Sequence, residues 1–402
     1  MTNFTLHAPT DFVFGKDAEL SVADMLKKHG ATKVFIHYGG GSVVRSGLLG
    51  RVEDKLKAAN IPYVMLGGAQ PNPIDTLVYE GIDICKKEKV DFVLAVGGGS
   101  AIDSAKAIAV GALHDGDFWE FFSGKPIERA LKIATILTIP AAGSEASSSM
   151  VITKVGPSGS AGEGALKRGS GSPLIVPTFS LLNPELNYTL PPFQTACGVS
   201  DMMAHVMERY FSTTKDVEIT DRLCEAILLA LITEAPKAIK DPKNYTARAN
   251  LTWSGVIAHN NSCGLGRAHD WSSHAMEHEL SALYDVAHGA GLAVIFPAWM
   301  KYVCDTDLDR FVQFATRVWG VEDARTDSPS DKKVVAMKGI EAMENFFTSI
   351  GLPINFEQLG AKKEDIDILV KSLNINQGNE YGGFKRLNMD DARKIYELAT
   401  IG

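Results

Sequence analysis

The sequence has little of what marks a secreted or membrane-spanning protein. Its 402 residues include five widely spaced cysteines and no C-x-x-C pair, which favours free thiols in a reducing compartment over a disulfide framework. The first residues, MTNFTLHAPTDFVFG, carry neither a basic segment nor an apolar run, so no signal peptide is predicted. No apolar stretch approaches the roughly 18 residues of a transmembrane helix. We therefore expect a cytoplasmic protein with no membrane partner.

Clustered positive charge is also missing. The chain has 40 Lys and Arg against 48 Asp and Glu, which gives a formal net charge of -8, and no long basic cluster. Because nucleic-acid binding depends on cations that neutralise phosphates, no nucleic-acid partner is expected. Hydrophobic residues make up 45% of the chain and charged residues 22%, which is typical of a globular protein with enough apolar material for its cores. A bound metal would therefore be functional rather than structural.

The first half of the chain alternates short apolar runs with helical periodicity. Strands are predicted at 33–38, 61–66, 91–96 and 133–139. Helices are predicted between them, at 44–59, 75–87 and 101–111. Such alternation indicates βαβ units around a parallel sheet, and near-continuous apolar strands suit a sheet covered on both faces. The Gly- and Ser-rich stretch 156–173 predicts a loop or a loose hairpin, and 174–182 a last strand.

After Pro191 and Pro192 the pattern changes. Helical periodicity with few β-branched runs continues to Gly402. We predict an α/β domain with a parallel, dinucleotide-binding sheet at 1–190 and an all-α domain at 191–402. The short linker indicates that the two domains pack together with a cleft between them.

Two glycine-rich junctions each follow a predicted strand and begin a helix. They are Gly39-Gly40-Gly41-Ser42 and Gly97-Gly98-Gly99-Ser100. Glycines allow close approach of a ligand, and a helix N-terminus offers free N–H groups to a diphosphate. Neither junction is the G-x-G-x-x-G fingerprint, and each alone also suits a plain strand-to-helix turn. Two of them favour a dinucleotide that touches both. Because the first loop contains no acid to repel a 2′-phosphate, NADP(H) is favoured and NAD(H) stays open.

Acidic and histidine residues in the second half have the spacing of metal ligands. Asp201 and His205 lie four residues apart in a helical stretch, His274 and His278 repeat that spacing, and His288 follows at a predicted helix end. Residues i and i+4 share one helix face. Three imidazoles and a carboxylate suit Zn²⁺ or Fe²⁺. Either pair alone is more often a surface or hydrogen-bonded pair, so spacing leaves the ligand set open.

Four stretches together resemble the iron-containing (group III) alcohol dehydrogenases, particularly their butanol dehydrogenase and NADPH-dependent aldehyde reductase branch. These are 38–42, 97–106, 138–145 and the Asp/His series from Asp201 to His288. The resemblance covers nearly the whole chain. It implies the two-domain fold described above and one divalent metal ion at the cleft, either Fe²⁺ or Zn²⁺ with Co²⁺ as a third candidate. It also implies a homodimer.

The resemblance implies roles for individual residues. The metal ligands would be Asp201, His205, His274 and His288, whereas His278 would lie beside the metal and either relay a proton or order water. The cofactor would contact Gly97, Gly98, Gly99 and Ser100 at the diphosphate, Asp103 near the nicotinamide, Gly39 and Ser42 at the adenosine ribose, Thr138, Ser144 and Ser147 along the cleft, and Thr189 and Leu190 at the domain junction.

Some residues of the region depart from that pattern or lack a role in it. The stretch 156–172 is longer and richer in Gly and Ser than its family counterpart, where a basic residue often helps to bind the cofactor. Lys154 is the nearest candidate for that residue. His259 and His269 lack a partner at ligand spacing, and we interpret them as structural.

These features predict an enzyme that interconverts small primary aliphatic alcohols, such as butanol, and aldehydes. The metal would polarise the substrate oxygen, and hydride would pass between substrate and nicotinamide. Glycerol dehydrogenases and dehydroquinate synthases share the architecture and are the alternative, but no Lys/Arg cluster for an acidic or phosphorylated substrate is evident in 190–290. Apolar residues near the metal motifs suit an aliphatic substrate: Trp253, Leu265, Trp271 and Phe296.

Overall fold

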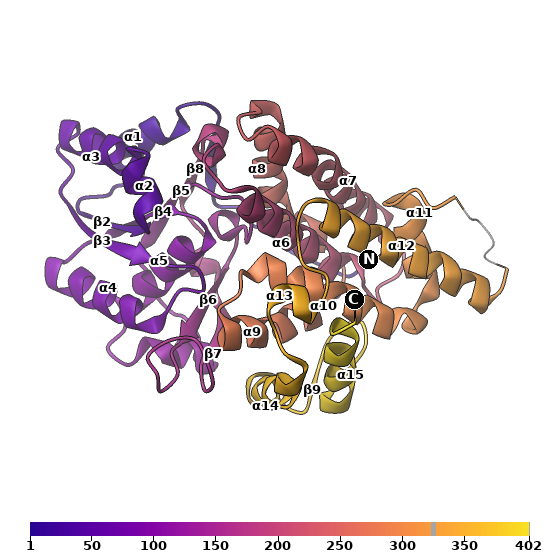
Figure 1. The fold of residues 1–402 in the computed structure, drawn as a ribbon. Coiled ribbons are helices and arrows are strands. Elements are labelled where there is room, and N and C mark those ends of the chain that lie inside the picture. Colours follow the sequence, from indigo (N-terminus) through magenta and orange to yellow (C-terminus); the bar gives the residue numbers. More distant parts are fainter. Residues whose placement is uncertain (323–326, 402) are drawn as a thin grey trace.

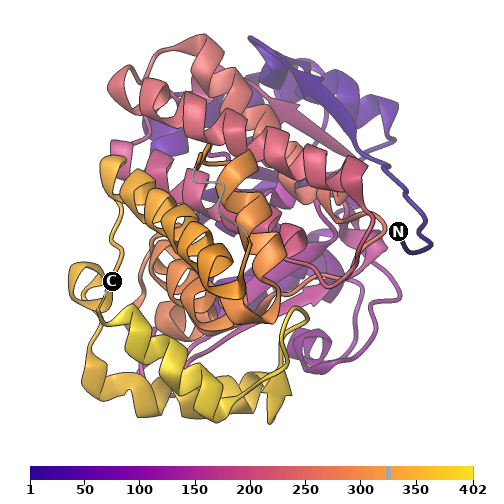
Figure 2. The ribbon, with the colours of Figure 1, turned by 90° about the vertical axis from the view of Figure 1, so that its right-hand side faces the viewer.

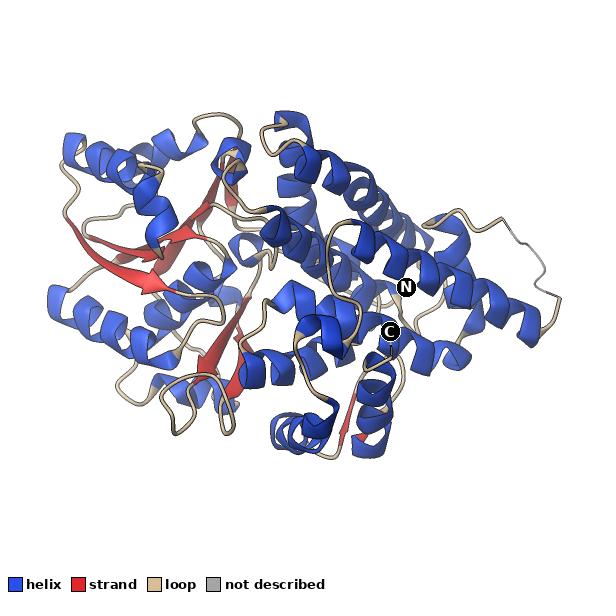
Figure 3. Ribbon diagram, in the orientation of Figure 1, coloured by secondary structure: helices blue, strands red, loops and turns tan. Residues whose placement is uncertain are grey.

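The computed structural model describes residues 1–322 and 327–401. Residues 323–326 and 402, which the helical prediction for the second half includes, lie outside the described residues. A strand-rich part and a helical part lie side by side, as Figure 1 and Figure 3 show. Among the described residues, no helix has the length and apolar character needed to cross a membrane.

A parallel sheet forms the centre of the strand-rich part. Its strands in spatial order are β1 (Asp11–Phe14), β8 (Phe179–Leu182), β5 (Lys132–Leu137), β4 (Phe92–Gly97), β2 (Val34–Gly39) and β3 (Tyr63–Ala69). One face packs against α4 (Asp75–Glu88) and α5 (Gly99–Gly111), and the other against α1 (Val22–Lys28) and α3 (Leu48–Ala58). Coverage of both faces explains why β4 is buried throughout, as its apolar run predicts.

Two strands differ from the prediction in detail, and a hairpin agrees with it. The edge strand β1 was not predicted, because its apolar run, Phe12-Val13-Phe14, is shorter than the runs of the predicted strands. The Gly- and Ser-rich stretch lies within an antiparallel hairpin, with β6 (Ser149–Lys154) paired to β7 (Leu166–Gly171). The hairpin form of this stretch is therefore confirmed. The predicted last strand, 174–182, is shorter than expected, because residues 173–175 form a 3-10 turn and β8 covers only Phe179–Leu182.

The helical part has one large hydrophobic core made by residues 196–399. Its helices in order are α6 (Pro192–Tyr210), α7 (Glu218–Lys240), α8 (Tyr245–His259), α9 (Ser272–Tyr284), α10 (His288–Val303), α11 (Leu308–Arg317), α12 (Pro329–Ser349), α13 (Phe356–Leu359), α14 (Ile366–Gln377) and α15 (Met389–Ala399). A short antiparallel pair, β9 (Glu380–Tyr381) and β10 (Leu387–Asn388), is an addition to the predicted helices. Figure 2 views the molecule from this side, where the helices stand in front of the sheet.

Helix α10 is the centre of this core. Its sequence HGAGLAVIFPAWMKYV is apolar almost all round, and it packs against α6, α9, α12 and α15. A helix that is apolar on all sides is stable only when it is buried. Because α10 begins at His288, burial of the helix also places that histidine inside the molecule.

Candidate active site

The four predicted metal ligands converge at the junction of α6, α9 and α10. Asp201 Oδ1 lies 3.4 Å from His205 Nε2 on the adjacent turn of α6. The ring of His274, from α9, has its centroid 4.3 Å from that of His205. Ligand atoms of these three residues lie within 4.8 Å of one another. His288 completes the group, because its Nε2 lies 3.8 Å from the same Asp201 oxygen.

A glycine allows the two helices to approach this closely. Gly289 is the second residue of α10, and a Cβ atom on it would overlap the carbonyl oxygen of Cys197 on α6. Only a residue without a side chain fits against the neighbouring backbone here. Gly289 therefore lets the start of α10 lie next to α6, which brings His288 beside Asp201.

Two buried carboxylates orient the histidines. His274 Nδ1 donates to Glu208 Oε1 at 3.0 Å, and the backbone N–H groups of Trp271 and His274 also donate to the Glu208 carboxylate. His288 Nδ1 forms a hydrogen bond with Glu277 Oε2. An imidazole that donates from Nδ1 keeps the Nε2 lone pair free for a metal, which is the usual carboxylate–histidine–metal arrangement.

Glu208 and Glu277 were missed in the sequence, although a signal for them exists. Each lies three residues after a predicted ligand, Glu208 after His205 and Glu277 after His274. Residues i and i+3 share a helix face. An acidic residue at that spacing therefore lies on the face that carries the predicted ligand, although Glu208 bonds to His274 and Glu277 to His288.

Burial keeps the imidazoles neutral. It lowers the pKa of His274 to about 4, and burial together with neighbouring cations lowers the pKa of His205 and of His288 well below the usual value. Burial also raises the pKa of Glu208 to about 7. A neutral imidazole is the form that binds a metal.

Unsatisfied polar atoms mark the centre of this group. Asp201 Oδ1 and His274 Nε2 are buried and have no hydrogen-bond partner among the described residues. A buried polar atom without a partner costs free energy, so such atoms normally have a ligand or ion. One divalent cation would satisfy both of them. The residues present therefore fit a metal ion.

A buried lysine reaches the same place from the hairpin. Lys167 on β7 is 5% exposed, and its Nζ lies 3.0 Å from Asn72 Oδ1, 3.4 Å from His288 Nδ1 and 3.5 Å from Glu277 Oε2. Lys154 instead stands over the ring of Trp119, 5.4 Å from its centroid. The structure thus places Lys167, and not Lys154, beside the ligand group. The register of the hairpin, which sequence reasoning did not specify, decides this.

Two further histidines adjoin the ligands. His278, one turn after His274, has its ring centroid 5.6 Å from that of His288. His259 has its centroid 3.6 Å from that of His205, and its Nε2 donates to the carbonyl oxygen of Ala141 at 3.1 Å. His259 therefore links the ligand group to the loop after β5.

The predicted cofactor loops lie side by side at the C-terminal edge of the sheet. A Cβ atom on Gly97 would lie 3.6 Å from the backbone nitrogen of Gly39. The first junction leads into α2 (Gly41–Arg45) and the second into α5. Thr138, at the end of β5, donates its backbone N–H to the Gly97 carbonyl at 3.0 Å. Both helix N-termini and the Thr138 loop thus border one edge, where ligands bind in open parallel sheets.

Buried charges hold the next segment in place. Asp103 accepts hydrogen bonds from Ser144 Oγ at 2.5 Å and from the Val151 backbone N–H at 2.9 Å. Lys106 Nζ donates to three backbone carbonyls within 144–149, at 2.7, 2.9 and 2.9 Å. Burial raises the pKa of Asp103 to about 6 and lowers that of Lys106 to about 8. Asp103 and Ser144 therefore contact each other, and Lys106 ties the loop of Ser144 and Ser147 to α5.

Thr189 and Leu190 lie in the turn between β8 and α6. The Leu190 backbone N–H donates to the Asn187 carbonyl at 3.2 Å; Leu190 is half-buried and Thr189 is exposed. They stand where the chain passes from the sheet to the helices.

The apolar residues expected near the metal separate in space. Trp271 lies beside the ligands, with its ring centroid 5.5 Å from that of His205 and 5.3 Å from that of His274. Trp253 instead packs edge-on against Phe12 and Phe14 at the β1 edge of the sheet. Phe296 is buried in the helical core.

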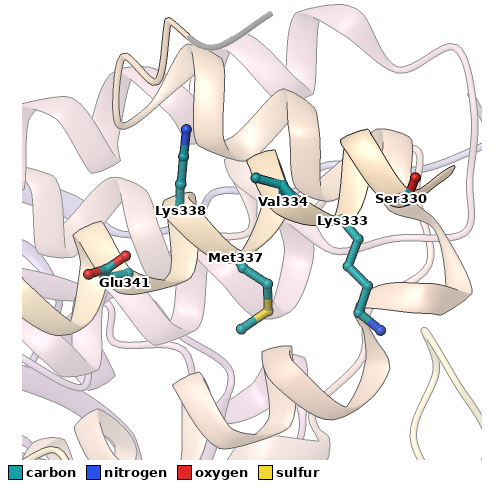
Figure 4. A pocket seen from close by; sticks show the side chains of 6 residues that line it. All are labelled: Ser330, Lys333, Val334, Met337, Lys338 and Glu341. Carbon is teal, nitrogen blue, oxygen red and sulfur yellow. The ribbon is translucent and has the colours of Figure 1, made fainter. Parts of the chain in front are cut away.

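A separate hollow lies on the outer face of α12, as Figure 4 shows, and contains none of the predicted site residues. It is lined by Ser330, Lys333, Val334, Met337, Lys338 and Glu341.

Comparison with known proteins agrees with this arrangement. The family description "Iron-containing alcohol dehydrogenase" matches residues 9–184, and "Fe-containing alcohol dehydrogenase family, C-terminal" matches residues 195–400. NADH-dependent butanol dehydrogenase A of Clostridium acetobutylicum is 38% identical, over 99% of this chain and 99% of that protein. The chain belongs to the iron-containing alcohol dehydrogenase family. The resemblance seen in the motifs is therefore confirmed.

Further members of the iron-containing alcohol dehydrogenases are equally similar. The NADPH-dependent aldehyde reductase of Escherichia coli is 37% identical, over 99% of this chain and all of that protein. The solved structure of NADH-dependent butanol dehydrogenase A from Thermotoga maritima superposes with a TM-score of 0.93 at 39% identity, over 100% of this chain and 99% of that one. The predicted fold class and enzyme class are confirmed: the chain is an NAD(P)(H)-linked alcohol–aldehyde oxidoreductase.

Proposed function

We propose that this iron-containing alcohol dehydrogenase interconverts small primary aliphatic alcohols, such as butanol, and their aldehydes. Asp201, His205, His274 and His288 would hold one divalent ion: Fe²⁺, Zn²⁺ or Co²⁺. The carrying observation is the convergence of these four side chains around buried atoms without hydrogen-bond partners. A metal bound there would supply Lewis-acid polarisation of the substrate oxygen. The protein's own part is to keep the imidazoles neutral and oriented through Glu208 and Glu277.

Nearby arginines support an uncharged substrate. Arg209 donates to the His205 carbonyl at 2.6 Å, Arg267 forms an ion pair with Asp221 at 2.7 Å, and Arg248 is buried. Since these guanidinium groups are engaged inside the protein, they do not form a site for a phosphate or carboxylate. This favours a plain alcohol over the phosphorylated or acidic substrates of a dehydroquinate synthase-like enzyme.

For the cofactor we propose NADP(H), with NAD(H) as the weaker alternative. The diphosphate would bind at the N-terminus of α5, and Gly39 and Ser42 of the first junction would contact the adenosine ribose. Hydride would move between the substrate carbon and the nicotinamide ring, so the protein's task is to position the two. The contacting residues would be Gly39, Ser42, Gly97, Gly98, Gly99, Ser100, Asp103, Thr138, Ser144, Ser147, Thr189 and Leu190.

The function is tested with apoenzyme prepared by chelation and reloaded with Fe²⁺, Zn²⁺ or Co²⁺. Butyraldehyde reduction should be lost in the apoenzyme and return with at least one ion, at higher kcat/KM with NADPH than with NADH. A panel of C2–C6 aldehydes and alcohols gives the substrate range. Full activity of metal-free protein, or no turnover of any panel member by any reloaded form, would contradict the proposal.

We also propose that His278 relays the substrate proton. Its ring adjoins that of His288, and it lies one helical turn beyond His274. His278→Ala should alter the pH dependence of kcat/KM while metal content stays at the wild-type level, because the residue is not a ligand. An unchanged pH–rate profile would show that His278 has no part in proton transfer.

The remaining proposals concern the domains, the oligomeric state and the location of the protein. Separate hydrophobic cores support domains at 1–190 and 191–402, because the core of the helical part is formed by residues 196–399. The edge strand β1 carries exposed Phe14 next to exposed Trp253, a surface that would suit a homodimer,. Sedimentation equilibrium should then give twice the chain mass, and a monomer mass would contradict the homodimer.

Five buried thiols, none of them in a disulfide, support a reducing, cytoplasmic location,. Cell fractionation that finds the protein outside the cytoplasm would contradict this proposal.

A further inference from the structure

Three loops border the adenosine end of the proposed cofactor site, and together they hold a single charged residue. They follow β2, β3 and β4 and comprise residues 39–47, 67–74 and 97–100. Every other residue in these ranges is uncharged. The exception is Arg45, the last residue of α2. These three loops themselves therefore contribute one positive charge and no negative charge.

The Arg45 side chain folds back over the first glycine junction. Its Nη1 atom occupies the place where a Cβ atom on Gly41 would stand. The residue is exposed, and no hydrogen bond or ion pair engages its guanidinium group within residues 1–322 and 327–401. An arginine held against a ligand-binding loop without an internal partner is free to bind a ligand anion.

We propose that Arg45 is the specificity-determining residue of the cofactor site and binds the 2′-phosphate of NADP(H). The proposal rests on the proposed function, in which Gly39 and Ser42 contact the adenosine ribose. Gly41 leaves room for the guanidinium, and Ser42 adds a hydroxyl donor beside it.

The chemistry of the two cofactors explains the selectivity. A guanidinium binds a phosphate through two parallel charge-assisted hydrogen bonds, whereas the 2′-hydroxyl of NAD(H) offers no charge. An acidic residue in these loops would bind the ribose hydroxyl and repel a phosphate, and none is present. Arg45 should therefore favour NADP(H) without contributing to binding of NAD(H).

Nucleotide fragments isolate this contact from catalysis. Isothermal titration calorimetry of the metal-loaded enzyme would compare 2′,5′-ADP with 5′-AMP, which differ by the 2′-phosphate. Arg45→Met should weaken 2′,5′-ADP and NADPH about tenfold or more, while 5′-AMP and NADH change by less than about twofold. Arg45→Lys should recover part of the loss, because it restores charge without the bidentate geometry.

A matched variant controls for net charge. Arg129 is exposed, donates to the Leu113 carbonyl, and precedes β5 at the opposite end of the strands. Arg129→Met should leave all four affinities unchanged. The proposal is overturned if Arg45→Met leaves 2′,5′-ADP binding intact, if it weakens 5′-AMP equally, or if the wild-type enzyme does not prefer 2′,5′-ADP. Because these are binding measurements, absence of butyraldehyde turnover would count against the proposed function alone.

Discussion

Replacing His274 by alanine is expected to remove stoichiometric metal binding and to lower kcat/KM at least about a thousandfold. The expectation follows from position: His274 Nε2 is buried without a partner, and its other nitrogen is held by Glu208. Replacing a residue that hydrogen-bonds to a metal ligand already costs about 10–100-fold in metal affinity or activity. Replacing the ligand itself should therefore cost more. Metal content by mass spectrometry and steady-state kinetics measure the two effects.

A graded variant and a control belong with this experiment. Glu208→Gln keeps an acceptor for His274 but removes the charge, so it should fall between the wild type and His274→Ala. His269 lies in the same region, and its Nε2 bonds to the Gly264 carbonyl at 2.9 Å. His269→Ala should retain the metal. If His274→Ala binds metal with wild-type stoichiometry and affinity, the proposed ligand set is wrong.

Lys167→Met is expected to lower the free energy of unfolding by about 3–5 kcal/mol and to reduce kcat/KM as well. Lys167 is 5% exposed and Glu277 fully buried, with 3.5 Å between Nζ and Oε2. Removing one partner leaves the other charge buried without compensation, which is the costly way to break such a pair. Because Glu277 also orients His288, the change should reach the metal site. Denaturant unfolding of the apo and metal-loaded forms separates the two effects.

Lys154 offers a matched control on the same hairpin. It is half-buried and contacts the Trp119 ring, an interaction worth about 0.5–1 kcal/mol at exposed sites. Lys154→Met should therefore change stability by no more than about 1 kcal/mol and leave kcat/KM unchanged. Equal losses in the two variants would show that the hairpin, rather than the buried ion pair, determines the effect.

The sequence by itself determined the features that local periodicity encodes. The apolar runs predicted the parallel sheet, the strand–glycine–helix junctions predicted the edge that faces the proposed cofactor, and i,i+4 spacing placed Asp201 with His205 on one helix face. These predictions succeed because helix and strand periods put neighbouring residues on one face whatever the rest of the fold does. The family motifs then joined segments that spacing alone left ambiguous.

The tertiary structure alone decided which distant side chains meet. Hairpin register brings Lys167, instead of Lys154, to Glu277 and His288. Pairing to β8 makes a strand of β1, whose apolar run is only three residues long, and Trp253 packs against β1 instead of lying beside the proposed metal ligands. Close packing of α10 on α6 at Gly289 sets His288 beside Asp201. Such contacts depend on how whole elements pack, and packing depends on side chains far apart in the chain, which no local pattern records.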